Sequence, residues 1–131
     1  MVLRLLPLLT LFVLGCSQDD TITPNDILGT WKLTEVYIDP GDGSGSFAPA
    51  DYEREITFYA DSTYRTSRLI CTILNQGEGA GTGRYSPVEQ VILPTECRIG
   101  AEYTYSVEGR ELTVFYWCIE GCAERYVKIR D

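Results

Sequence analysis

The chain of 131 residues contains no histidine. This absence excludes nucleophile activation of the Ser-His-Asp and Cys-His types. It also removes histidine metal sites and the most common general base near neutral pH. No pair of carboxylates is placed to take over that role. The sequence therefore predicts a protein that is not an enzyme and that holds neither a metal ion nor a cofactor.

Basic residues are scarce as well. The chain has 11 Lys and Arg against 19 Asp and Glu, which gives a formal net charge of -8. Binding to nucleic acid needs clustered Lys and Arg that contact phosphates, and docking on an anionic lipid surface needs the same. The charge therefore excludes nucleic acid as a partner and electrostatic binding to a membrane.

The chain has no hydrophobic run long enough to span a membrane. Arg4 precedes an apolar run from Leu5 to Leu14 that contains Pro7. A spanning helix needs about 20 apolar residues, so this run is too short. A basic start followed by a short apolar run is typical of a secretory signal. We therefore expect residues 1–15 to be a signal peptide.

The end of this run resembles the bacterial lipobox, L-x-[GA]-C, at Val13-Leu14-Gly15-Cys16. The resemblance implies that the chain is cut before Cys16 and that the Cys16 thiol carries lipid, with residues 16–26 as a tether. Several acyl chains give stable anchoring where a single chain does not. Residues 17–21 (SQDDT) resemble the acidic export signal of some outer-membrane lipoproteins. The expected location is therefore the outer membrane, on its periplasmic or its cell-surface side.

The other four cysteines are predicted to form disulfides, because an even count in an exported chain favours them. Four cysteines allow three pairings. Cys118 and Cys122 flank a three-residue turn between two strand-like runs, and residues that face each other across a hairpin come close enough for a bridge. We therefore favour Cys118–Cys122 with Cys71–Cys97. The alternative is a zinc site, but zinc sites usually show two close cysteine pairs and this chain has one.

Most of the chain after residue 26 reads as short strands rich in Tyr, Thr, Val and Ile, which indicates an all-β barrel or sandwich. Eight are expected, at Gly29–Asp39, Tyr52–Ala60, Thr63–Ile73, Thr82–Ser86, Gln90–Leu93, Glu102–Val107, Glu111–Cys118 and Cys122–Arg130. An eight-stranded antiparallel up-and-down barrel over residues 27–131 pairs its first and last strands, and this removes both exposed edges. A Greek-key sandwich is the alternative.

Three motifs in this segment resemble lipocalin-like domains of bacterial lipoproteins. Gly29 and Trp31 match the G-x-W signature that opens lipocalins and related small calycin barrels. Residues 56–58 (ITF) with 61–64 (DSTY) resemble the second hairpin of the bacterial domains, and residues 112–127 resemble their end. The resemblance implies a lipocalin-like barrel whose tryptophan packs across the closed end.

Nine tyrosines give this segment its aromatic character. Tyr64, Tyr103, Tyr105 and Tyr116 are the candidates for a pocket that binds a small, mostly apolar ligand, since tyrosine joins an apolar body to a polar tip. The alternative is that they fill the core, because eight-stranded barrels are often just wide enough for their own side chains. The second hypothesis for function is a surface interaction or structural module of the cell envelope without an internal ligand. Its protein partner is unknown.

Two glycine-rich segments superficially resemble ligand-binding loops. We interpret both as ordinary connecting loops. Asp39 and Asp42 lie three residues apart, which does not supply the alternating ligands of a calcium loop. Residues 77–83 are followed by no lysine and lie in no βαβ unit, so they do not form a phosphate-binding loop.

Overall fold

The computed structural model describes residues 27–71, 73 and 78–131. The predicted signal peptide, the tether and Cys16 lie outside the described residues. Nine strands form within them: β1 (Gly29–Ile38), β2 (Ser46–Pro49), β3 (Glu55–Phe58), β4 (Thr63–Thr66), β5 (Gly81–Ser86), β6 (Val91–Pro94), β7 (Tyr103–Glu108), β8 (Glu111–Tyr116) and β9 (Cys122–Arg130).

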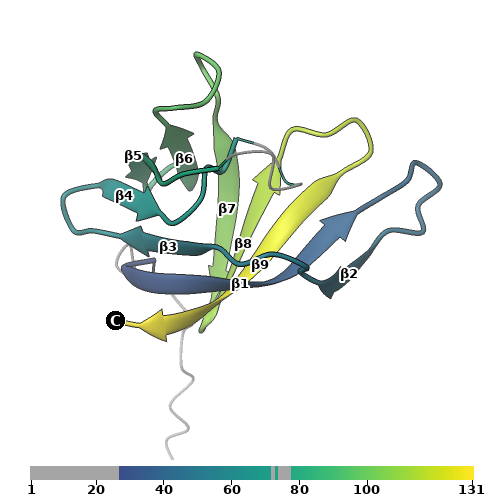
Figure 1. Cartoon of the computed structure of the whole chain (residues 1–131), viewed down its shortest axis with the longest axis horizontal. Coiled ribbons are helices and arrows are strands. Elements are labelled where there is room, and N and C mark those ends of the chain that lie inside the picture. The colour runs from purple at the N-terminus through teal and green to yellow at the C-terminus, as the bar shows by residue number, and fades with distance from the viewer. Residues whose placement is uncertain (1–26, 72, 74–77) are drawn as a thin grey trace, which may run out of the picture.

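Eight of these strands close into an antiparallel barrel (Figure 1). From β3 to β9 each strand pairs with the next one along the chain, and β1 closes the ladder by pairing with β3 on one edge and β9 on the other. Sequential pairing of this kind is the up-and-down topology. It confirms the predicted all-β barrel and excludes the Greek-key sandwich.

Strand β2 lies outside the closed ladder and was not predicted. It pairs with Glu35–Ile38, the second half of β1, while β3 pairs with Gly29–Lys32 on the same edge. Only Phe47 of β2 is partly shielded from solvent, so the strand lacks the alternation by which a buried strand is recognised. The ring of Phe47 packs on that of Tyr37, with centroids 5.4 Å apart. The pairing with β1 and the contact between Phe47 and Tyr37 therefore stabilise a strand that its own sequence does not indicate.

The loop between β1 and β2 uses its acidic side chains to hold a turn. The Asp39 carboxylate accepts hydrogen bonds from the backbone N–H groups of Gly41 at 2.7 Å and Gly43 at 3.2 Å, and Asp42 accepts one from Ser44 at 2.9 Å. The bond from Gly41 is the main cause that lowers the pKa of Asp39. These contacts are typical of Asx turns.

The barrel is closed at the end where β1 starts. Trp31 is fully buried there, and its Nε1 donates a hydrogen bond to the carbonyl of Ile27 at 2.7 Å. Gly29 has a φ of +105°, and a Cβ at this position would lie 2.3 Å from the carbonyl oxygen of Arg130. Only glycine fits such a backbone. The G-x-W motif thus has a steric reason for its glycine and a packing reason for its tryptophan.

Residues alternate between inward and outward along each strand, and the inward-facing ones pack inside the barrel. Residues 81 and 83 of β5 point inward together with Tyr85. A Cβ at Gly83 would lie 2.7 Å from the ring of Tyr64 and 2.3 Å from the carbonyl oxygen of Leu93. Gly83 therefore gives the Tyr64 ring room inside the barrel, which explains this glycine without a phosphate ligand.

The described part of residues 27–131 holds the nine strands, the β1–β9 pairing that closes the ladder and the buried core. Both disulfides also join cysteines of this segment.

Candidate ligand site at the barrel mouth

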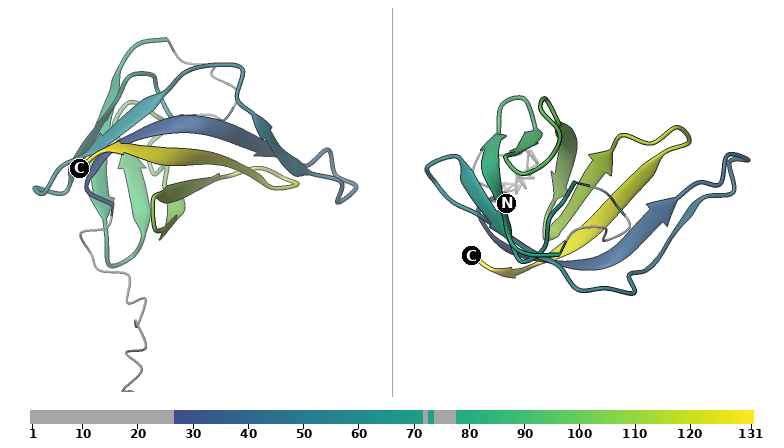
Figure 2. Two further views of the ribbon diagram at one scale, coloured as in Figure 1. Left: turned by 90° about the horizontal axis from the view of Figure 1, so that it is seen from below. Right: turned by 45° about the horizontal axis from the view of Figure 1, so that its top comes forward.

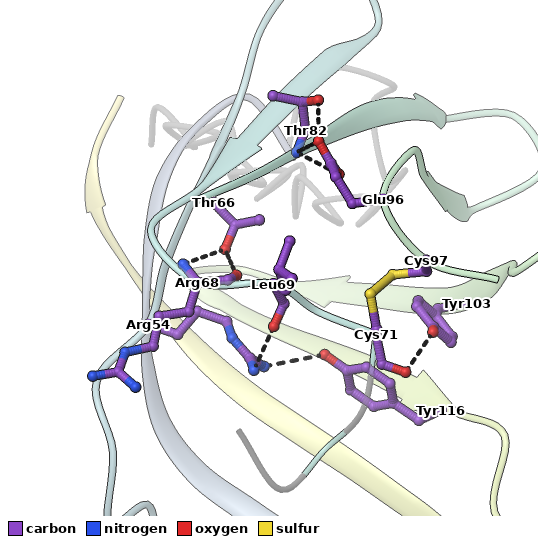
Figure 3. Close-up of a disulfide and its surroundings, with 10 residues drawn as sticks. All are labelled: Arg54, Thr66, Arg68, Leu69, Cys71, Thr82, Glu96, Cys97, Tyr103 and Tyr116. Atoms are coloured by element: carbon purple, nitrogen blue, oxygen red, sulfur yellow. Dashed lines mark hydrogen bonds between the residues drawn. A yellow bond between two sulfur atoms is a disulfide. The ribbon is translucent and has the colours of Figure 1, made fainter. Parts of the chain in front are cut away.

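Two disulfides lie at the end of the barrel opposite Trp31. Cys71 pairs with Cys97 across a Cα–Cα distance of 5.1 Å, and Cys118 pairs with Cys122 across 5.8 Å. This confirms the predicted pairing and excludes the zinc alternative, because none of these four cysteines keeps a free thiolate. Figure 3 shows the Cys71–Cys97 bridge, which joins the segment after β4 to the connection between β6 and β7. The other bridge closes the β8–β9 hairpin.

A pocket of about 640 Å³ opens beside these bridges, and we call it the mouth pocket. Its described lining consists of Cys71, Ile73, Cys97, Arg98, Ile99, Gly100, Ala101, Tyr103, Tyr116, Trp117 and Cys118. These residues come from the start of β7, the end of β8 and the loops beside them. Both this volume and the mostly apolar lining are typical of pockets that hold small molecules.

Tyr103 and Tyr116 form an aromatic pair in this lining. Their ring centroids lie 4.7 Å apart. The Tyr103 hydroxyl donates to the carbonyl of Cys71 at 2.9 Å (Figure 3), and the Tyr116 hydroxyl donates to Oε2 of Glu124 at 2.6 Å. Both hydroxyls already have partners, so the pair offers the pocket ring surface more than hydrogen-bonding capacity.

The rim of the pocket exposes large apolar side chains. Trp117 is 85% exposed, Ile99 is 100% exposed, and Ile119 in the adjacent turn is 99% exposed. The Trp117 indole N–H donates to the carbonyl of Glu102 at 2.7 Å, which fixes a ring that is otherwise in solvent. Clusters of exposed apolar side chains often mark binding sites.

The hairpins on either side of this end reach out together. Figures 1 and 2 show the β1–β2 and β8–β9 hairpins extending on the same side of the barrel. The backbone N–H of Asp39 donates to the carbonyl of Gly121 at 3.2 Å and joins the two tips. Between them, on the outer face, Tyr37, Phe47, Phe115 and their neighbours line a second, shallower groove of about 390 Å³.

A buried ion pair lies inside the barrel behind the mouth pocket. Arg54 and Glu124 are both fully buried, with 2.6 Å between Nη1 and Oε1. The second amino group of Arg54 donates to the carbonyl of Leu69 at 2.9 Å (Figure 3). Three tyrosine hydroxyls donate to the Glu124 carboxylate, those of Tyr52, Tyr116 and Tyr126. A buried charge pair is tolerated when its hydrogen bonds are satisfied in this way.

The network determines which of its groups carry charge. Burial raises the pKa of Tyr116 and of Tyr126, and the nearby Glu124 raises both further, so both phenols stay neutral. Burial by itself lowers the pKa of Arg54, but Tyr126 and Glu124 raise it by more, and the guanidinium stays charged. The space around Arg54 and Glu124 is thus occupied by a hydrogen-bonded network, in which only Nε of Arg54 lacks a partner among the described residues.

Arg54 and Glu124 were not predicted as a buried pair, although the period of the strands contains the signal. Tyr52 and Arg54 alternate in step with Ile56 and Phe58, which places all four on the inward face. Glu124 alternates in the same way with Cys122 and Tyr126. Charged residues in phase with a buried face indicate an internal ion pair.

The structure brings together two of the four tyrosines predicted to bind a ligand. Tyr103 and Tyr116 line the mouth pocket. Tyr64 packs on Phe58 with ring centroids 5.8 Å apart, and its buried hydroxyl has no hydrogen-bond partner among the described residues. The Tyr105 hydroxyl donates to the carbonyl of Ser86 at 3.3 Å, and burial raises the pKa of this phenol to about 12.

No protein-family model, curated protein or solved structure matches this chain. Fold and site still define a class, that of small antiparallel barrels with one sealed end and one apolar mouth. The barrel is consistent with a calycin-like fold. Within the part of the chain that the structure describes, no helix has the length and apolar character to cross a membrane.

Proposed function

We propose that the protein is a binding protein without catalytic activity, which takes up a small, mostly apolar ligand at the mouth pocket. The observation that carries this proposal is the pocket of about 640 Å³ at the mouth of the barrel, whose described lining includes Tyr103, Tyr116 and Trp117. Trp117, which is 85% exposed, offers such a ligand an apolar ring, whereas Tyr103 and Tyr116 are largely buried in the pocket wall.

Energetics favour an occupant at this place. Ile99 and Trp117 stay in water in the free protein. Covering apolar surface contributes about 25 cal/mol per Å², and the bonded Trp117 ring loses little further freedom when a ligand packs on it. The two disulfides hold the surrounding loops, which lowers the entropic cost of ordering them on binding.

The test is a titration of oxidised residues 27–131 with the apolar fluorescent probe N-phenylnaphthylamine. We expect saturable binding of one molecule per chain. Trp117→Ala should weaken it at least about tenfold, which is the size expected for a central aromatic contact. Val88→Ala is the matched control, since Val88 is 86% exposed in the turn between β5 and β6. Binding that does not saturate, or that is equally strong without Trp117, would contradict the proposal.

A surface interaction module without an internal ligand is the second candidate. The groove lined by Tyr37, Phe47 and Phe115 favours it, because an apolar hollow on an outer sheet face suits a protein partner. Envelope extracts passed over immobilised wild-type, Phe47→Ser and Trp117→Ala protein distinguish the two candidates. Specific retention that depends on Phe47 and not on Trp117 supports the interaction module.

Anchoring in the outer membrane through lipid on Cys16 is the second part of the proposal, and the lipobox resemblance supports it. Cys16→Ala should abolish labelling by radioactive palmitate in the producing cell. Residues 27–131 do not include this position, so the variant should retain the barrel. Labelling that persists in Cys16→Ala would show that the anchor is elsewhere.

A further inference from the structure

We propose that the mouth pocket selects a planar, ring-containing molecule with a single negative charge, and that Arg98 binds the charged group. This inference rests on the proposed function, since it assumes a ligand at the mouth pocket. It adds the chemical class of that ligand. Two features carry it, the aromatic walls and one unpaired cation at the rim.

The walls are aromatic and their polar atoms are already bonded. The Tyr103 hydroxyl, the Tyr116 hydroxyl and the Trp117 indole N–H each donate to a partner within the protein, at 2.9, 2.6 and 2.7 Å. What these walls offer a ligand is ring surface, namely the exposed Trp117 ring and the small accessible parts of the buried Tyr103 and Tyr116 rings. Aromatic pairs gain from offset or edge-to-face contacts beyond the area that they bury. A flat ring therefore suits these walls better than a flexible chain or a sugar.

Arg98 is the one charged residue in the described lining of the pocket. It lies exposed in the loop that carries Cys97 and Ile99. Among residues 27–71, 73 and 78–131, no carboxylate lies within ion-pair distance of its guanidinium. Arg98 is thus a free cation beside an apolar pocket.

The carboxylate nearest in sequence is committed elsewhere. Glu96 accepts hydrogen bonds from the backbone N–H of Thr82 at 3.0 Å and from the Thr82 hydroxyl at 2.7 Å (Figure 3). This leaves the planar guanidinium of Arg98 available to a ligand, and its paired N–H donors match a carboxylate or sulfonate. A ring on the tyrosine pair and an anion at Arg98 fill the two kinds of surface that the pocket offers.

The overall charge makes this preference testable. A net charge of -8 repels anions from the chain as a whole, and this repulsion is screened within about 10 Å at moderate ionic strength. Any preference for an anion over its neutral analogue must then come from a local cation. Nonspecific electrostatic forces from a negatively charged chain would instead favour the neutral analogue.

The experiment compares three probes by isothermal titration calorimetry on oxidised residues 27–131. Naphthoate has the ring and the charge, naphthamide has the ring alone, and decanoate has the charge and a similar number of carbons in a chain. We expect naphthoate to bind about fivefold more tightly than naphthamide, which is the upper end for one partly exposed ion pair. We also expect naphthoate to bind more tightly than decanoate.

Arg98→Gln should remove the preference for naphthoate over naphthamide and leave naphthamide binding unchanged. Arg98→Lys should retain part of it, because lysine keeps the charge and loses the paired donors. Arg65→Gln is the matched control, since Arg65 is exposed on β4 and does not line the pocket. The Arg65→Gln variant should keep the wild-type preference for naphthoate over naphthamide.

The outcomes separate the two proposals. If naphthamide or decanoate binds as tightly as naphthoate, the proposed class of ligand is wrong. The mouth pocket then remains a binding site. The same conclusion follows if N-phenylnaphthylamine binds in a Trp117-dependent way and none of the three probes does. If N-phenylnaphthylamine does not bind either, the proposed function itself fails.

Discussion

The two tryptophans make the same hydrogen bond and serve opposite ends of the barrel. The indole N–H of each donates to a backbone carbonyl at 2.7 Å, that of Ile27 for Trp31 and that of Glu102 for Trp117. Trp31 is nevertheless fully buried, whereas Trp117 is 85% exposed. The bond fixes the ring in both places, and the surroundings decide whether the fixed ring closes the core or faces solvent.

The two ends are also held in different ways. The closed end depends on strand pairing, with Gly29 against the backbone of Arg130 and Lys128 stacked 5.1 Å from the Trp31 ring centroid. At the mouth, two covalent bridges join the loops. The comparison suggests that stability is concentrated at the closed end and binding at the mouth.

The largest expected contrast comes from the two tryptophans themselves. Trp31→Ala should lower the free energy of unfolding by about 3–5 kcal/mol, because it leaves a cavity in the core. Trp117→Ala should change it by no more than about 0.5 kcal/mol, as for other surface substitutions. Urea unfolding of residues 27–131 measures both. Similar losses for the two variants would show that the ends do not differ in this way.

The ion pair inside the barrel sharpens the comparison. Arg54→Met should destabilise the protein by about 3–5 kcal/mol, since it leaves Glu124 as an uncompensated buried charge. Arg54→Met combined with Glu124→Leu should recover much of this loss, because both charges are then gone. Equilibrium unfolding of the single and double variants tests the coupling. Strictly additive losses would mean that the two residues do not act as a pair.

The two disulfides should contribute unequally. Loop closure in the unfolded chain predicts about 3.5 kcal/mol for a separation like that of Cys71 and Cys97 and about 2 kcal/mol for the shorter one. Their sequence separations are 26 and 4 residues. Paired Cys→Ser variants at each bridge, compared by thermal unfolding, measure the difference. A larger loss at Cys118–Cys122 would indicate that the hairpin bridge stabilises the fold by another mechanism.

The smallest effect concerns alkaline pH. Burial raises the pKa of Tyr105 from 10.0 to about 12. The folded state then keeps a proton that the unfolded state has already lost, so the stabilisation is complete below pH 10 and declines as pH rises toward 12. Tyr105→Phe should make the stability less dependent on pH in this window. An unchanged dependence would assign the decline to other groups.

Much of the barrel follows from the sequence because strand patterns are local. The alternation in β7 and β8, the G-x-W start and the C-x-x-x-C turn each depend on residues that are neighbours along the chain. Strand β2 escaped prediction because its stability comes from pairing with β1. The sequence was sufficient where the cause of a structure lies within the same segment.

The mouth pocket was predictable only in part. Tyr103 and Tyr116 were predicted as pocket residues, and both line the pocket. Arg98 lies outside regular strands, and its place follows from the disulfide-linked loops around it. Its contribution therefore became visible only when distant segments were brought together.

The central claim is that a ligand binds at the mouth and not at the closed end, and the two indole N–H groups report on both. Their NMR signals, assigned with Trp117→Phe, can be followed while isotope-labelled residues 27–131 are titrated with N-phenylnaphthylamine. We predict that the Trp117 signal shifts and saturates at one equivalent, whereas the Trp31 signal stays in place. A Trp117 signal that does not move, or a Trp31 signal that moves equally, would contradict this account.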